Sequence, residues 1–108
     1  MAEKTNISPS VYKAVHKFRV AVEEAGFRIA SFYVFGSQIK GKAKKWSDID
    51  VAVISPDFNS DRHTQRVHLM KISDKIDDSI EPHPFTPEEF DDKYYTLAQE
   101  VKRIGVKI

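Results

Sequence analysis

Two apolar runs separated by a polar segment constrain the fold of this chain more than any other feature of its sequence. The first run ends at Gly36 and Ser37, and after ten further residues Asp48 and Asp50 open the second run. Side chains of a strand alternate between its two faces, so aspartates two positions apart are expected on one face. Aspartate is uncommon in strands, and like charges on one face repel unless solvent or a cation separates them. The pattern predicts two neighbouring strands, the second of which carries two carboxylates on one face.

The turn after the first run has the residue types of a phosphate-binding segment. Gly36 allows a sharp turn and a close approach by a phosphate, because it has no Cβ. Ser37 offers a hydroxyl and a main-chain N–H where a helical turn would begin, and anions are favoured there. Lys40 and Lys42 lie in the lysine-rich loop that follows; such a loop is often only solvated, but this one is tethered to the turn. We expect these four residues to bind a nucleoside triphosphate.

Carboxylates beside a phosphate site indicate a magnesium centre. Asp48 and Asp50 are expected to hold Mg²⁺, and Glu81 is the candidate third ligand, on a strand at 79–85. Glu81 would also orient or deprotonate an attacking hydroxyl group. Each feature also has a plainer interpretation. Gly36-Ser37 could be only a turn, the two aspartates could lie at a solvated strand end, and Glu81 could be an ordinary glutamate of an edge strand. His83 shares a face with Glu81, and we interpret it as a surface histidine.

The hydrophobic periodicity predicts alternating helices and strands in one domain covering residues 1–108. Ser8-Pro9 and Thr86-Pro87-Glu88-Glu89 are helix-start patterns. Prolines in the third strand favour a short or edge position. Helices are expected at 9–25, 61–76 and 87–104, with a further short one at 37–43, and strands at 27–35, 48–54, 79–85 and 106–108. These elements predict an α+β fold: a small mixed sheet of about four strands with helices packed on one face.

Composition narrows the function only slightly. The 108 residues have a net charge of +1 and no cysteine. The small charge argues against nucleic acid as a partner, and the absence of cysteine excludes thiol chemistry and a disulfide framework. We find no signal-peptide pattern and no apolar stretch of bilayer length, so we expect a cytoplasmic protein that does not enter a membrane.

The pattern Gly36-Ser37, ten residues, then Asp48-x-Asp50 resembles the signature of the nucleotidyltransferase superfamily that includes DNA polymerase beta and kanamycin nucleotidyltransferase. The small size resembles the minimal nucleotidyltransferases of bacteria and archaea, some of which are antitoxins that transfer AMP to a tyrosine of a helical HEPN-type toxin. The resemblance implies a nucleotidyltransferase-like fold, Mg²⁺, ATP and such a partner. The sequence departs from many relatives at the third acid, where Glu81 precedes a proline.

Three functions remain open. The first is an Mg²⁺-dependent nucleotidyltransferase that transfers AMP from ATP to a hydroxyl group on a partner protein, as an antitoxin does to a HEPN-type toxin. The second is a non-catalytic module that binds nucleotide and docks to a helical partner. The third is a small-molecule nucleotidyltransferase of the aminoglycoside type, for which a homo-oligomer would have to supply the acceptor pocket.

Overall fold

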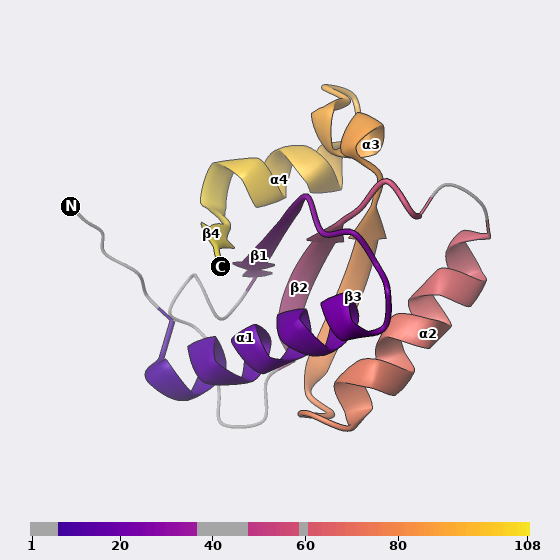
Figure 1. The fold of residues 1–108 in the computed structure, drawn as a ribbon. Coiled ribbons are helices and arrows are strands. Elements are labelled where there is room, and N and C mark those ends of the chain that lie inside the picture. The colour runs from indigo at the N-terminus through magenta and orange to yellow at the C-terminus, as the bar shows by residue number, and fades with distance from the viewer. Residues whose placement is uncertain (1–6, 37–47, 59–60) are drawn as a thin grey trace.

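The computed structural model describes residues 7–36, 48–58 and 61–108, and in it helices surround one four-stranded sheet (Figure 1). The elements are α1 (Pro9–Glu24), β1 (Ser31–Phe35), β2 (Ile49–Ile54), α2 (Arg62–Asp74), β3 (Ile80–Phe85), α3 (Pro87–Asp91), α4 (Thr96–Ile104) and β4 (Val106–Lys107). The predicted α+β fold with a mixed sheet and packed helices is confirmed. The short helix predicted at 37–43 lies outside the described residues.

The strand order is β3-β2-β1-β4, which places β3 at an open edge as its prolines predict. β1 is antiparallel to β2 and β4, whereas β2 and β3 are parallel. The carbonyl oxygens of Ser79 and Phe85 accept hydrogen bonds from N–H groups at the two ends of β2. Odd-numbered residues of β3 therefore direct their backbone groups toward β2. Pro82 and Pro84 alternate with these residues, so their backbone groups point to the edge of the sheet, away from β2. No N–H group is needed there, because no further strand in the described part of the chain pairs with β3.

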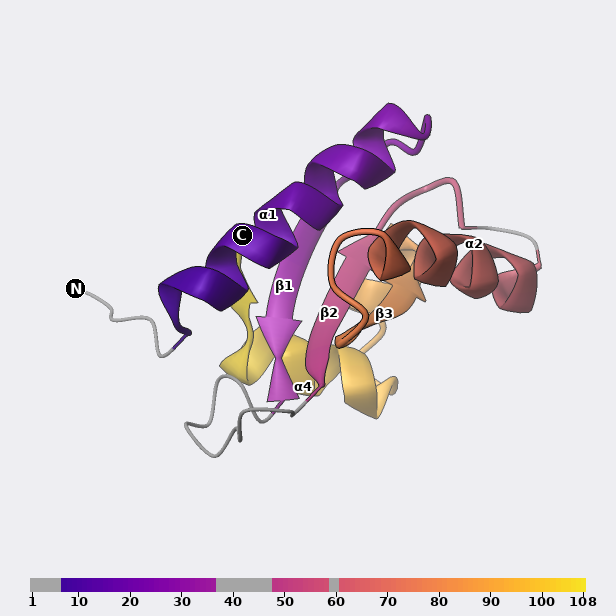
Figure 2. The same ribbon diagram turned by 90° about the horizontal axis from the view of Figure 1, so that it is seen from below.

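Helices cover both faces of the sheet, so the prediction of helices on one face is wrong. α1 and α2 lie on one face, and α3 and α4 lie on the other (Figures 1 and 2). The reason is that β1 and β2 are apolar on both sides, and both sides must be shielded from water. The first core includes Val15, Phe18, Val22, Leu69, Phe32, Val34, Val51 and Val53. The second consists of Phe35, Ala52, Ile54, Phe85, Phe90, Ala98 and Val101.

Helix caps set the boundaries of the helices. Ser8 accepts a hydrogen bond from the Val11 N–H, and Thr86 and Glu89 form the predicted capping box. The helix predicted at 87–104 is two helices, because Asp92 has an extended backbone and its Oδ1 accepts the Tyr94 N–H at 2.9 Å. This local hydrogen bond competes with helix continuation. Among the residues described, none of the helices has the length and apolar character needed to cross a bilayer.

Arg62 closes part of the open sheet edge. From the first turn of α2, its Nη1 donates to the Pro84 carbonyl at 3.2 Å, and its Nη2 donates to Glu89 Oε1 at 2.6 Å. The same Nη2 also donates to the Phe58 carbonyl at 3.2 Å. One guanidinium thus joins α2, β3 and α3. Arg66, one turn further along α2, therefore lies beside β3 as well.

Candidate active site

Gly36 and Asp50 meet where β1 ends and β2 begins. Phe35 pairs with Asp50 across the two antiparallel strands, so Gly36 follows directly beside the Asp50 side chain. Gly36 has a φ of +81°, a conformation that favours glycine. A Cβ added at this position would overlap the Asp50 carboxylate. The glycine is therefore required both by the turn and by the position of the acid next to it.

Glu81 lies beside Asp50 because the parallel register of β2 and β3 pairs these two residues. Both side chains project from the face that α3 and α4 cover, since they share strand parity with buried Ala52 and Phe85. The side chains are 25% exposed at Asp50 and 43% exposed at Glu81, so the carboxylates are accessible. The predicted neighbourhood of these two acids on adjacent strands is present in the structure. Asp48 precedes β2 and is exposed.

His83 is the third member of this cluster. Its Nε2 lies 3.2 Å from Asp50 Oδ1 and 4.0 Å from Glu81 Oε1. Its ring packs edge-on against Phe35, with centroids 5.2 Å apart, and its side chain is only 21% exposed. The interpretation of His83 as a surface histidine is therefore wrong. The alternation of side chains along a strand already indicated that His83 shares a face with Glu81. The distance from His83 to Asp50 depends on the register of β2 and β3, which the alternation does not specify.

The environment of Glu81 disfavours its ionised form. Partial burial is the largest cause that raises its pKa, followed by a hydrogen bond with Asp50 and by repulsion from the charges of Asp50 and Asp48. A protonated His83 acts in the opposite direction. The Arg66 guanidinium lies 3.5 Å from Glu81 Oε2, the oxygen other than the one nearest His83. Glu81 thus belongs to a group of acids that repel one another in the absence of a cation.

Asp50, Glu81 and His83 fit a divalent cation. Each offers one ligand atom, and the three atoms lie within 4.8 Å of one another. Carboxylate oxygens are the ligands that Mg²⁺ takes, and a dication between them would relieve the repulsion at Glu81. Asp48 is not one of these three, although its charge reaches Glu81. The remaining predicted nucleotide-binding residues, Ser37, Lys40 and Lys42, lie outside the described part of the chain.

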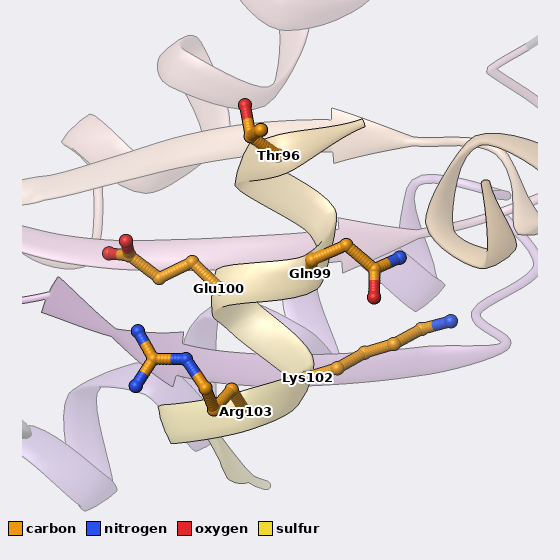
Figure 3. A pocket seen from close by; sticks show the side chains of 5 residues that line it. All are labelled: Thr96, Gln99, Glu100, Lys102 and Arg103. Atoms are coloured by element: carbon orange, nitrogen blue, oxygen red, sulfur yellow. The ribbon is translucent and has the colours of Figure 1, made fainter. Parts of the chain in front are cut away.

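The outer face of α4 has a separate surface hollow of about 480 Å³. Figure 3 shows that its side chains fan out to both sides of the helix instead of converging on one point. Its charges are mixed in sign. The lining residues are Thr96, Gln99, Glu100, Lys102 and Arg103. This hollow offers no convergent set of groups, in contrast to the cluster at Asp50.

Comparisons with known proteins agree with this geometry. Residues 15–105 match the sequence profile of a family described as nucleotidyltransferase domain. The chain also resembles the crystal structure of a Sulfolobus solfataricus protein provisionally named a nucleotidyltransferase. The TM-score is 0.55 at 18% identity, over 93% of this chain and 86% of that one. At this identity the likeness shows the fold. No curated protein sequence matches the chain.

Proposed function

Because the chain belongs to the nucleotidyltransferase domain family, we propose that it transfers AMP from ATP to a hydroxyl group on a partner protein. The observation that most supports this proposal is the pairing of Asp50 with Glu81 on adjacent strands, directly beside Gly36. Carboxylates that can hold divalent cations beside a phosphate group suit nucleotidyl transfer. The expected cofactor is Mg²⁺.

The proposed ligands of the cation are Asp50 and Glu81, with Asp48 as a further ligand. When bound, the cation supplies positive charge against the phosphate oxygens of the nucleotide and against the charge that develops during transfer. Gly36 leaves space for the phosphates. We propose that Ser37, Lys40 and Lys42 contact the β- and γ-phosphates that leave.

Glu81 is the proposed proton acceptor. Its carboxylate is accessible and pairs in register with Asp50, so it lies where an acceptor hydroxyl could reach it beside the nucleotide. The acceptor hydroxyl gives its proton to Glu81 and its oxygen forms a bond to the α-phosphorus. The bond from that phosphorus to the oxygen bridging to the β-phosphate breaks, and pyrophosphate leaves. The product is a phosphodiester between AMP and the acceptor.

The open position of the cluster favours a protein as acceptor. Glu81 and Arg66 have side chains about two-fifths exposed, at the free edge of the sheet. Among the residues that the structure describes, the hollow beside His83, lined by Arg62, Arg66, Tyr95 and neighbouring residues, measures about 160 Å³. Pockets for drug-sized molecules are usually about 300–1,000 Å³. A side chain of a docked protein needs no such pocket, and the sequence resemblance points to a helical HEPN-type toxin in the cytoplasm.

Radiolabelled ATP tests this proposal. The full chain is incubated with Mg²⁺, a candidate HEPN-type partner protein or an aminoglycoside, and ATP labelled either at the α- or at the γ-phosphate. We expect covalent label from α-labelled ATP only, with mass spectrometry placing AMP on a tyrosine. Label from the γ-phosphate would instead indicate phosphoryl transfer. A stable complex that acquires no label would favour the non-catalytic docking module, and AMP on an aminoglycoside alone would favour the small-molecule enzyme.

A further inference from the structure

We propose that His83 is a direct ligand of the cation at this site and shifts its preference from Mg²⁺ toward a transition-metal dication such as Mn²⁺. The proposal rests on the proposed function, because it concerns the same cluster. It differs in giving the site an imidazole nitrogen in addition to carboxylate oxygens. That nitrogen lies on the strand that supplies Glu81, two residues further along.

The distances fit ligation of one ion. Two ligand atoms each about 2.1 Å from a metal are separated by about 3.0 Å when they are adjacent and by about 4.2 Å when they are opposite. His83 Nε2 lies 3.2 Å from the Asp50 oxygen, near the adjacent value, and 4.0 Å from the Glu81 oxygen, near the opposite value. One ion can span these two separations without rearrangement of the strands, and all three ligand atoms lie within 4.8 Å of one another.

The surroundings hold the imidazole in this position. His83 pairs with Ala52 in the parallel register, and its ring packs edge-on against Phe35. The nitrogen nearest both carboxylates is Nε2. The second Glu81 oxygen lies toward Arg66, which leaves the first oxygen on the His83 side. Three ligand atoms from β2 and β3 therefore converge from a rigid sheet.

Ligand chemistry then determines the choice of metal. Mg²⁺ takes oxygen ligands and keeps much of its water, whereas imidazole suits first-row transition metals. For a given nitrogen and oxygen set, affinity rises along that row from Mn²⁺ to Cu²⁺. Replacing an oxygen or water ligand by the His83 nitrogen should therefore strengthen Mn²⁺ binding relative to Mg²⁺. An imidazole that only orients Asp50 would not contact the ion.

Pulsed electron paramagnetic resonance of bound Mn²⁺ tests ligation without relying on enzyme activity. The full chain is prepared with ordinary or with ¹⁵N-labelled histidine, and Mn²⁺ and unlabelled ATP are added. We expect nitrogen modulation that changes on ¹⁵N labelling, which identifies a histidine nitrogen of the protein instead of the adenine. His83→Gln should remove this modulation. His63→Gln, at an exposed position of α2, is the matched control and should retain it.

Metal competition provides the second measurement. Mn²⁺ and Mg²⁺ affinities are measured for the same three proteins, and circular dichroism checks their folding. We expect the preference for Mn²⁺ over Mg²⁺ to fall about tenfold in His83→Gln and to stay unchanged in His63→Gln. Bound Mn²⁺ without histidine modulation in the wild type would overturn the ligand role and leave the proposed function intact. Failure of the wild type to bind either metal with ATP would overturn both.

Discussion

Asp57 and Glu81 are carboxylates near opposite ends of β2, and their surroundings shift their pKa values in opposite directions. Asp57 follows the end of β2 and accepts hydrogen bonds from the Arg28 guanidinium at 2.7 and 3.1 Å and from its backbone N–H at 2.7 Å. The bond from the Arg28 side chain is the largest cause that lowers the pKa of Asp57. At the other end of the strand, partial burial and Asp50 raise the pKa of Glu81.

The difference separates a carboxylate paired with a cation from one held beside another acid. Asp57 accepts three hydrogen bonds from Arg28, and its negative charge is favourable in the folded chain. Glu81 is held beside another acid, so its charge is unfavourable until a cation binds. Groups kept in such a position despite their cost to stability are typical of functional sites. The predictions below test this contrast, from the largest expected effect to the smallest.

Matched amide substitutions at the two ends of β2 should have very different effects on transfer. Asp50→Asn removes a charge from the cluster, and we expect AMP transfer to fall at least roughly a hundredfold, because charge stabilisation at the transferred group is lost. Asp57→Asn should leave the transfer rate within about twofold of the wild type. Steady-state assays with α-labelled ATP measure both. Equal losses in the two variants would remove the distinction between the sites.

Gly36→Ala should affect both stability and activity. A residue with a Cβ at positive φ costs about 1–2 kcal/mol, and at Gly36 the Cβ also overlaps the Asp50 carboxylate. We expect transfer to fall roughly tenfold or more. Gly26→Ala is the control, because Gly26 has a φ of +100° with open space around it. Denaturant unfolding should show a loss in both variants, the larger one in Gly36→Ala, and only Gly36→Ala should lose activity. Unchanged activity in Gly36→Ala would contradict the close approach to Asp50.

Loss of the Arg28 pair should be seen in stability alone. Asp57→Asn and Arg28→Gln each remove one charge of the ion pair and leave the other residue without an oppositely charged partner. Because the pair is partly exposed, the melting temperature should fall by a few degrees at most. The double variant should lose little more than either single variant, because the same interaction is removed. Thermal unfolding at neutral pH measures this. Additive losses would show that the two residues do not act as a pair.

The pH dependence of stability should have opposite signs at the two carboxylates. The pKa of Asp57 is lowered from 3.8, so its stabilising contribution is present above the unfolded pKa and is lost as pH falls through the folded value. The pKa of Glu81 is raised from 4.5, so its ionisation destabilises the metal-free protein as pH rises through the folded value. Melting temperatures of wild type, Asp57→Asn and Glu81→Gln between pH 3 and 7 measure both effects.

At neutral pH, Asp57→Asn should have a lower melting temperature than the wild type. In acid, the melting temperatures of the two proteins should become similar. Glu81→Gln should match the wild type in acid and exceed it by about 1 °C at neutral pH. A glutamine variant that is less stable than the wild type at neutral pH would show that Arg66 outweighs the repulsion from Asp50.

Local sequence signals predicted much of the fold because they act over a few residues. The Thr86 capping box and the edge position of β3 follow from residue types at fixed spacing. Helix packing on both faces was missed, although the apolar runs at 31–35 and 51–54 contain apolar residues on both sides. The sequence did not predict that a helix ends at Asp92. Its side chain accepts a hydrogen bond from the Tyr94 N–H, but an aspartate can make several kinds of local hydrogen bond, and the sequence does not specify which one forms.

The candidate site was predictable in part for the same reason. The spacing between Gly36 and Asp50 matches a known sequence pattern. Asp50 and Glu81 were expected on adjacent strands. The position of His83 against Asp50 depends on the parallel register of β2 and β3, which no local pattern specifies. The Arg28–Asp57 pair likewise joins residues 29 positions apart.

Glu81→Gln tests the central claim most directly, because it changes one proton-accepting group and little volume. Transfer of α-labelled AMP to the partner protein and binding of ATP with Mg²⁺ are measured on the same folded preparation at neutral pH. If Glu81 is the proton acceptor of a reactive cluster, transfer should fall at least roughly a hundredfold while nucleotide is still bound. Transfer at the wild-type rate would contradict this role and remove Glu81 from the active site.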